Sequence, residues 1–427
     1  LSPGLLAPSQ VYTTDASATS AVLTLYSYYP TTNSLGYFTY AGGLAADELQ
    51  TSSSTADLLQ FAASSVTATN TTMDNYLWIY PYQVIREANQ AIAGLNASTS
   101  VSAATKSQLL GEALFFRAFY FFHLVNYFGP VPLTLNTTEI DNAAIGRTDT
   151  ATLYAQMITD LKQAESLLPS AYVTTLHARV NKYAAAALLA RIYLYTNDYP
   201  DAETEATKVI GATDVTYSLP APASTFVNTS PETILQFATL YGYSMFGAGY
   251  RTTSASTPPT YYLFNNFVGS FESGDLRRSA WIDSAGSGTG LYYRINKYKL
   301  ATATAGNEYN VVLRLAEQYL IRAEARAHLY TDLTGAKADL NTVRARAGLG
   351  ATTATTSQSL LTAILQERKV ELFGESAHRW FDLKRTGQAN TVLGAAKPST
   401  WQPTAVLLPI PQTELLLNNK LTQNPGY

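Results

Sequence analysis

Helical periodicity recurs through most of this 427-residue chain and constrains its fold more than any other feature. In the first strongly periodic segment, Trp78, Tyr82 and Ile85 recur at spacings of four and three residues, which places them on one face of a helix. Segments of this kind predict helices at residues 73–95, 103–128, 151–168, 180–196, 200–210, 311–330, 333–347, 360–373 and 377–385. The pattern therefore predicts a mainly α-helical protein.

The helices follow one another in pairs, with small residues where the two members of a pair would cross. Leu189, Ala190, Tyr193 and Ala202 surround the turn at 197–200 with the spacing of a tetratricopeptide repeat. Alanine suits such positions because closely crossing helices leave no room for larger side chains. We expect tetratricopeptide-like helical hairpins that form a superhelical scaffold over residues 73–211 and 311–386.

Residues 212–310 interrupt this scaffold with Pro258-Pro259 and with glycine-rich stretches at 242–249 and 286–290. A structureless loop of this length is unusual inside a domain, so an irregular, loop-rich insertion of turns and short strands packed on the helices is expected. Thirteen of the 58 residues from Tyr241 to Tyr298 are aromatic, against 12% in the whole chain. With one further helix expected at 16–29, the chain is predicted to form a single domain over residues 1–427.

Composition excludes several classes of function. The net charge of −3 and the pI near 5.9 argue against a nucleic-acid-binding protein, which usually has a domain pI above about 9. The absence of cysteine excludes disulfides, thiolate metal sites and cysteine nucleophiles. The four histidines are scattered and none pairs at the spacing of metal ligands, so neither a metal nor a cofactor is expected: His123, His177, His328 and His378.

One acidic cluster is a candidate for catalysis, because glycoside hydrolysis needs two carboxyl groups. Its members lie near the end of the helical region: Glu367, Glu371, Glu375 and Asp382. Basic residues alternate with them at the i, i+3 and i+4 spacings that favour ion pairs. We therefore interpret the cluster as structural and expect no enzymatic activity.

Several ordered sequence blocks carry a family resemblance. They are Leu77–Asn89, Glu112–Phe122 followed by Tyr127–Pro132, Arg314–Ala325, Asn341–Leu349, Glu367–Glu375 followed by Arg379–Arg385, Leu408–Pro411 and Asn424–Tyr427. In this order the blocks resemble the SusD/RagB family of nutrient-binding lipoproteins of Bacteroidota. The matching motifs belong to the family's helical scaffold, so they leave the ligand site undefined.

The resemblance implies a lipoprotein on the cell surface, held in the outer membrane by a lipidated N-terminal cysteine that is not part of this chain. It also implies a partner, a SusC-like TonB-dependent transporter, on which the protein would sit as a lid. Members of the family bind a glycan, or sometimes a peptide, before import. The function that follows is nutrient uptake in polysaccharide utilisation.

Candidate ligand-binding residues come from side-chain chemistry. Sugars present apolar C–H faces and neutral hydroxyls, which suit aromatic rings with neutral polar neighbours. Residues of this kind gather in the loops at 36–40 and 241–262 and near two later aromatics, so the predicted set is Tyr37, Tyr40, Asp47, Tyr243, Tyr250, Trp281 and Tyr292. Asp47 would accept hydrogen bonds from sugar hydroxyls. For Trp281 two interpretations stay open, a ligand contact or a seal between the middle segment and the helices.

The charge distribution predicts a neutral ligand. The first 85 residues contain no lysine, arginine or histidine, so a site built from them has no cation for uronates or sulfates. Arg277 and Arg278 adjoin Asp275 and Asp283, which favours local pairing of these arginines. We therefore expect a non-catalytic protein that captures a neutral oligosaccharide or polysaccharide. A peptide-capturing member of the same family is the first alternative, and a glycosidase is the second.

Overall fold

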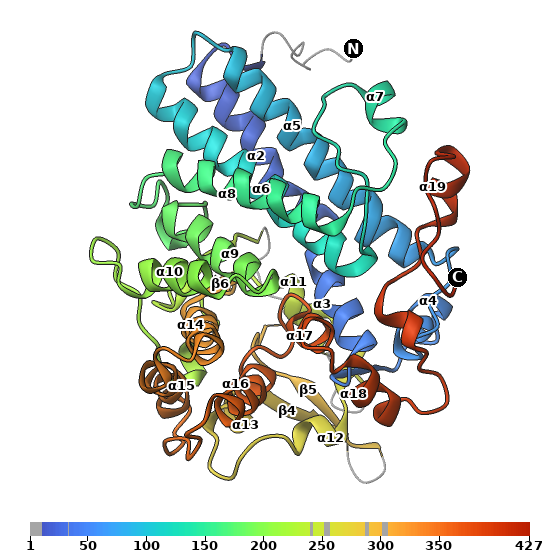
Figure 1. The fold of residues 1–427 in the computed structure, drawn as a ribbon, viewed down its shortest axis with the longest axis vertical. Helices are drawn as coiled ribbons and strands as arrows, with labels where there is room; N and C mark the ends of the chain where they lie inside the picture. Colours follow the sequence, from blue (N-terminus) through green and yellow to red (C-terminus); the bar gives the residue numbers. More distant parts are fainter. Residues whose placement is uncertain (1–10, 33, 240–241, 252–256, 287–289, 301–305) are drawn as a thin grey trace.

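The structure of the chain is a computed structural model that describes residues 11–32, 34–239, 242–251, 257–286, 290–300 and 306–427 (Figure 1). The fold is mainly α-helical, as predicted. The longer helices are α2 (Asp15–Thr32), α3 (Ser34–Ala45), α5 (Tyr80–Ala97), α6 (Ala103–Phe128), α8 (Thr150–Leu167), α9 (Lys182–Tyr195), α10 (Tyr199–Ile210), α14 (Leu315–Leu329), α15 (Leu333–Arg346), α16 (Ser357–Glu371), α17 (His378–Arg385) and α18 (Ala389–Ala396). Within the described residues, none of the helices has the length and apolar character needed to cross a bilayer.

Shorter elements complete the chain. They are α4 (Ala56–Ala62), the π-helix η1 (Met73–Ile79), α7 (Glu139–Ala143), α11 (Met245–Ala248), α12 (Asn265–Val268), α13 (Leu276–Trp281) and α19 (Gln412–Leu417). Strands β1 (Leu49–Thr51), β3 (Tyr261–Leu263), β5 (Tyr292–Ile295) and β4 (Ile282–Ala285) form a four-stranded sheet in this order. Strands β2 (Thr233–Phe237) and β6 (Asn310–Arg314) form an antiparallel pair.

Helix α6 is the centre of the N-terminal helices and is buried on nearly all sides between α2, α5 and α8. Its apolar positions run almost all round, which is typical of a helix enclosed by neighbours. Arg117 on α6 donates to both carboxylate oxygens of Asp160 on α8, at 2.7 and 2.8 Å, and to Asn89 on α5 at 3.0 Å. One buried guanidinium therefore joins three helices.

The following helices form the expected superhelical scaffold, since α8, α9, α10, α14, α15 and α16 pack in succession (Figure 1). Ala190 and Ala202 are fully buried, as the repeat spacing predicts for the crossing of α9 and α10. A buried ion pair at 2.7 Å between Arg191 and Glu317 joins α9 to α14.

The predicted start of the helix at 311–330 is wrong. The helix begins at Leu315, and residues 310–314 form β6. This strand is fully buried and pairs with β2, with Leu313 opposite Leu235. A short buried strand and the first turn of a buried helix look alike in periodicity, and only the pairing with a distant strand separates them. The short strands expected in the middle segment are confirmed by β2, β3, β4 and β5.

Helix α3 is not predicted from the sequence, because three glycines lower its helix propensity. Packing on α17 explains why it forms. A Cβ atom at Gly42 would lie 2.3 Å from the Cβ of Ala377, so only glycine permits the two backbones to approach this closely. This contact fixes the helix that carries Tyr37 and Tyr40.

Candidate ligand-binding site

Six tyrosines from separate chain segments form a continuous row of ring contacts, which we call the tyrosine ladder: Tyr80, Tyr76, Tyr37, Tyr40, Tyr250 and Tyr261. The rings of Tyr37 and Tyr76 are stacked with centroids 3.8 Å apart, and those of Tyr40 and Tyr261 are stacked at 4.2 Å. Edge contacts at 6.0 Å between Tyr37 and Tyr40 join the two stacks. The ladder thus connects α3, η1, the start of α5 and β3.

The inner end of the ladder is buried and fixed by hydrogen bonds. The Tyr40 hydroxyl donates to the Met245 carbonyl at 2.8 Å and accepts from the Gly249 N–H at 3.3 Å. Burial raises the pKa of Tyr250 and Tyr261 well above the usual value, with further contributions from neighbouring tyrosines, so both hydroxyls stay protonated. These rings form a rigid base for the remainder of the ladder.

The outer end of the ladder is only partly buried. Tyr37, Tyr76 and Tyr80 are each of intermediate exposure. Burial and then the adjacent Tyr76 hydroxyl raise the pKa of Tyr37, which keeps its hydroxyl neutral. Neutral rings held in place by a buried base and open to solvent on one side can stack on the apolar face of a sugar without losing side-chain entropy.

A second aromatic pair lies on one face of the four-stranded sheet. Tyr262 on β3 and Tyr292 on β5 meet edge to face with ring centroids 4.9 Å apart. The register that pairs Leu263 with Tyr293 places these two rings on the same face. On that face the Arg294 guanidinium is held by Asp283 at 2.6 Å. We call Tyr262 and Tyr292 the sheet pair.

The structure brings some of the predicted residues together and separates others. Tyr37, Tyr40 and Tyr250 meet in the ladder, whereas Tyr292 lies in the sheet pair. Tyr243 is partly exposed and follows residues 240–241, which lie outside the described part of the chain. The predicted set does not include Tyr76, Tyr80, Tyr261 and Tyr262, although the last two lie in the predicted aromatic loop at 241–262. The i, i+4 spacing of Tyr76 and Tyr80, away from the apolar face of their helix, is a signal that could have found the first two.

Asp47 has a structural partner. Arg379 holds both of its carboxylate oxygens at 2.7 and 2.9 Å, and Lys369 lies at 3.5 Å. Burial opposes ionisation of Asp47, but Arg379 and Lys369 outweigh it and hold its pKa below the usual value. The carboxylate is therefore engaged in joining the α3–β1 link to α17, and its contact with sugar hydroxyls stays a prediction.

Trp281 is 1% exposed, and its indole N–H donates to the Pro222 carbonyl at 2.7 Å. The Lys297 ammonium lies 4.6 Å from one of its rings and the Arg346 guanidinium 5.1 Å. Of the two interpretations left open by the sequence, these contacts fit the seal between the middle segment and the helices. A ligand cannot reach the ring in this conformation.

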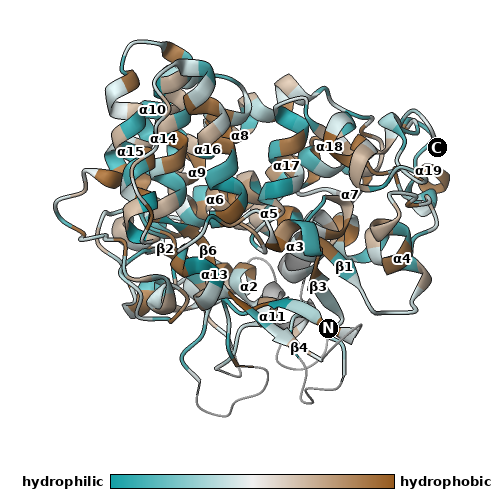
Figure 2. Cartoon of the chain, turned by 90° about the horizontal axis from the view of Figure 1, so that it is seen from below, coloured by the Kyte–Doolittle hydropathy of each residue, from teal (hydrophilic) through white to brown (hydrophobic). Residues whose placement is uncertain are grey.

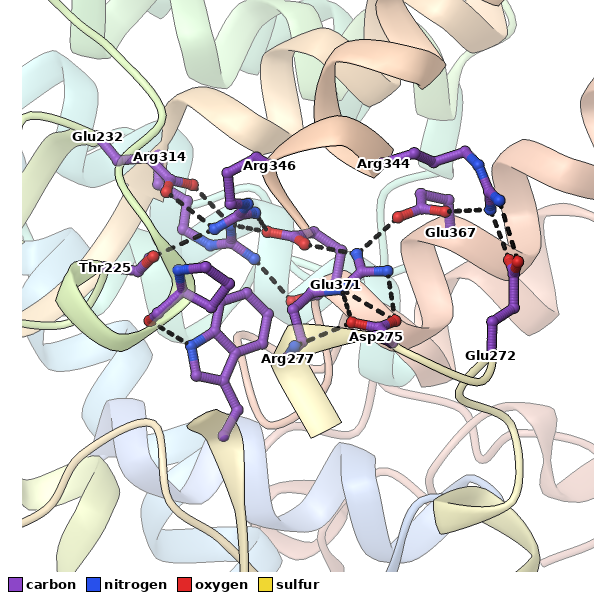
Figure 3. A network of polar contacts seen from close by, with 12 residues as sticks. Thr225, Glu232, Glu272, Asp275, Arg277, Arg314, Arg344, Arg346, Glu367 and Glu371 are labelled. Atoms are coloured by element: carbon purple, nitrogen blue, oxygen red, sulfur yellow. Dashed lines mark hydrogen bonds and ion pairs between the residues drawn. The ribbon is translucent and has the colours of Figure 1, made fainter. Parts of the chain in front are cut away.

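Three members of the acidic cluster, Glu367, Glu371 and Glu375, lie in a buried ion network with arginines, and Figure 3 shows the part around Glu367 and Glu371. The fourth member, Asp382, pairs instead with Arg368 at 2.8 Å and Arg385 at 2.7 Å. Arg314 contacts Glu232, Glu371 and Glu375 at 2.5–2.7 Å, and Arg277 contacts Asp275, Glu367 and Glu371 at 2.6–2.8 Å. Arg346 also pairs with Glu371. Burial opposes ionisation of Glu371, yet the surrounding cations hold its pKa far below the usual value. Such carboxylates stabilise the fold and lack the open, protonatable pair that a glycosidase needs.

No group of histidines, aspartates and glutamates that could hold a metal ion occurs within the described residues. Burial lowers the pKa of His123 to about 3, and its Nδ1 lies 2.9 Å from the Phe119 carbonyl of its own helix.

Glu48 lies at the inner end of the ladder and gives a pH prediction. It is buried, it accepts the Gly374 N–H at 3.0 Å, and burial raises its pKa to about 7. In the unfolded chain a glutamate ionises near pH 4.5, whereas Glu48 in the folded protein stays neutral up to about pH 7. The free energy of unfolding is therefore highest below pH 4.5 and falls as the pH rises from 4.5 to about 7. A shift of this size corresponds to about 3 kcal/mol.

We expect Glu48→Gln to remove this loss, since the amide oxygen can still accept the Gly374 N–H. Urea unfolding measures the free energy of unfolding of both proteins at pH 4.5 and pH 8. The difference, variant minus parent, should be up to about 3 kcal/mol larger at pH 8 than at pH 4.5. A constant difference between the two proteins across this range would show that Glu48 is already ionised in the folded state.

Comparisons with known proteins agree with this architecture. A family model described as "Starch-binding associating with outer membrane" matches residues 22–194, and the SusD family model matches residues 245–427. SusD-like protein P2 of Formosa agariphila is 29% identical over 83% of this chain and 81% of its own length. SusD-like protein P25 of the same organism is 25% identical over 99% of this chain and 94% of its own.

Solved structures share the fold over nearly the whole chain. A SusD superfamily protein from Bacteroides vulgatus has a TM-score of 0.85 at 20% identity and covers 97% of this chain and 99% of its own. A structure described as "Laminarin binding SusD-like protein" has a TM-score of 0.81 at 25% identity, with 97% and 100% covered. Family models on both halves and relatives along the full length lead to one conclusion: the chain belongs to the SusD/RagB family.

Proposed function

We propose that this protein is a non-catalytic glycan-binding protein of the cell surface. It captures a neutral oligosaccharide or polysaccharide and delivers it to a SusC-like TonB-dependent transporter in the outer membrane, where a lipid anchor holds it. The observation that carries the proposal is the tyrosine ladder, with its fixed inner end and its accessible outer end at Tyr37, Tyr76 and Tyr80. The starch-binding description of the matching family model and the similarity to a laminarin-binding protein support glycan as the ligand, and that description also supports the outer membrane as the location.

The site works by stacking and neutral hydrogen bonding. A pyranose ring would lie against the partly exposed rings, and the tyrosine hydroxyls would exchange hydrogen bonds with sugar hydroxyls. Because the stacked pair of Tyr40 and Tyr261 supports the outer rings of the ladder, those side chains lose little conformational entropy when a sugar binds. The sheet pair offers a second platform of the same chemistry, and Tyr243 and Tyr292 remain proposed contacts.

Tyr76→Ala is expected to weaken glycan binding about 5- to 30-fold, since a central aromatic contact is worth about 1–2 kcal/mol. Affinity electrophoresis and calorimetry with laminarin, starch and other neutral glycans measure this. Tyr292→Ala tests the sheet pair in the same way. Tyr330→Asn is the matched control, because Tyr330 is 72% exposed outside both clusters and asparagine tolerates its left-handed φ of 60°. Unchanged affinity of both Tyr76→Ala and Tyr292→Ala for a glycan that the parent binds would exclude these platforms as the site.

Binding should depend little on salt, because a neutral ligand releases few ions. We expect dissociation constants that agree within about twofold between low and high NaCl. A sulfated or uronate-containing polymer that bound tightly, and severalfold more weakly as salt rose, would contradict the neutral-ligand proposal.

The non-catalytic role has its own test. Each bound glycan is incubated with the protein for hours while reducing ends are assayed. We expect no increase over the buffer control, because the carboxylates of the acidic cluster are buried in ion pairs. New reducing ends that disappear in Glu371→Gln would replace the binding proposal with a glycosidase.

A further inference from the structure

A cavity of about 600 Å³ lies between α5, the segment that contains α7, and α19. None of the ladder tyrosines lines it. Trp78, Ile79, Tyr82, Pro132 and Leu417 give it a mainly apolar wall. Its volume falls in the range of pockets that bind ligands or inserted side chains.

Exposed aliphatic side chains surround the cavity. Ile140 on α7 is 83% exposed, and Leu416 and Leu417 on α19 are 77% and 81% exposed. Both views of the molecule place α7 and α19 at the same edge (Figures 1 and 2), and Asn418 after α19 donates to the Ile145 carbonyl after α7 at 2.9 Å. Single exposed apolar residues are ordinary, but a group around a pocket indicates an interaction surface.

The size of the surface favours a polypeptide over a small ligand. Leu416 and Ile140 are absent from the wall of the cavity, so a molecule that only filled it would leave them in water. A chain segment can insert one side chain and cover the rim with its neighbours, as anchor residues do at protein interfaces.

The charged residues at the cavity indicate which kind of polypeptide it would bind. Glu414 lines the wall, and Thr413 beside it donates to Asp74 at 2.8 Å. Among the described residues no lysine, arginine or histidine forms an ion pair with either carboxylate. Burial and then repulsion by Asp74 raise the pKa of Glu414, and burial raises that of Asp74. Arg86 also lines the cavity, and it is paired with Glu87 at 3.2 Å. Glu414 and Asp74 are therefore two neighbouring acidic groups without a paired cation, and a cation placed against them would favour their ionised forms.

We propose that this face docks a partner polypeptide, which inserts a large apolar side chain beside Trp78 and Tyr82 and places an adjacent lysine or arginine against Glu414 and Asp74. The residues that line this cavity differ from those of the tyrosine ladder, so different variants test the two proposals. Apolar insertion supplies the affinity, and the two carboxylates discriminate against acidic partners.

The test uses the whole chain and three probes: a blocked hexapeptide of leucine and lysine, the same peptide with glutamate in place of lysine, and hexylammonium. We expect the lysine peptide to bind at least tenfold more tightly than the glutamate peptide and than hexylammonium. Glu414→Gln and Leu416→Ser should each weaken lysine-peptide binding about fivefold. Glu165→Gln, on α8 and outside the cavity wall, should leave it unchanged, and thermal melting should show that all variants fold.

Three results would overturn the proposal. Equal binding of the two peptides, or no peptide binding, would remove the partner chemistry. Loss of affinity in Glu165→Gln as large as in Glu414→Gln would indicate attraction by the net negative charge alone. Hexylammonium that binds as tightly as the lysine peptide would make the cavity a site for small amines.

Discussion

Replacing Arg314 by methionine is expected to lower the free energy of unfolding by about 3–5 kcal/mol, because it removes one member of a buried ion network. The Arg314 side chain is 2% exposed and contacts three carboxylates from two parts of the chain, Glu232 in one and Glu371 and Glu375 in the other. Methionine fills much of the volume but leaves these carboxylates without their shared cation in a site of low dielectric constant. Urea unfolding at pH 7 measures the change.

Lys208→Met is the matched control for this prediction. Lys208 also contacts two carboxylates, Glu165 and Glu205, each at 2.8 Å, but its side chain is 40% exposed. Exposed pairs contribute only about 0–1 kcal/mol, since water and salt screen them. Similar losses in the two variants would show that burial does not determine the value of the Arg314 network.

Trp380→Ala is the second large prediction, with an expected loss of about 3–5 kcal/mol as a large-to-small change in the core. Trp380 on α17 is 1% exposed and packs edge to face against Trp401 with centroids 6.1 Å apart. The Lys384 ammonium lies 5.1 Å from its ring. Removal of the indole leaves a cavity that the surrounding helices cannot fill without moving.

Tyr243→Ala provides the comparison, because Tyr243 is only partly buried and should cost little stability. Differential scanning calorimetry of both variants gives the answer directly. If both variants melted at the temperature of the parent, the assignment of Trp380 and the last scaffold helix to the core would be wrong. A loss in Tyr243→Ala equal to that in Trp380→Ala would instead place Tyr243 in the core.

Local structure was largely predictable from the sequence. The bounds of α6 and α10 agree with the predicted ones to within one residue, and those of α8 also agree to within one. The signals that start, continue and end a helix lie within a few turns of one another along the chain, so they can be recognised in the local sequence. The same pattern failed at β6, where pairing with β2 from a distant segment decided between strand and helix. Helix α3 escaped prediction because its stability comes from the contact of Gly42 with Ala377.

The arrangement of the candidate site was less predictable from the sequence than the helices were. Composition and aromatic clustering predicted tyrosines as ligand contacts, and the fold brings three of them, Tyr37, Tyr40 and Tyr250, into one row. Their contact with a ligand stays a prediction. No local pattern indicated that Trp281 would be buried against Pro222, because that contact joins segments 59 residues apart.

Periodicity and residue type thus determined that this protein is a helical scaffold without metal–thiolate sites, and its charge predicts no nucleic-acid partner. Tertiary structure alone decided which polar and aromatic side chains remain accessible. The carboxylate of Asp47 meets the guanidinium of Arg379 across 332 residues of chain, and that pairing makes it structural. Stacking of Tyr37 on Tyr76 makes those rings a platform. The physical reason is that a side chain's hydrogen bonds, charge state and exposure depend on its neighbours in space, which sequence spacing does not specify.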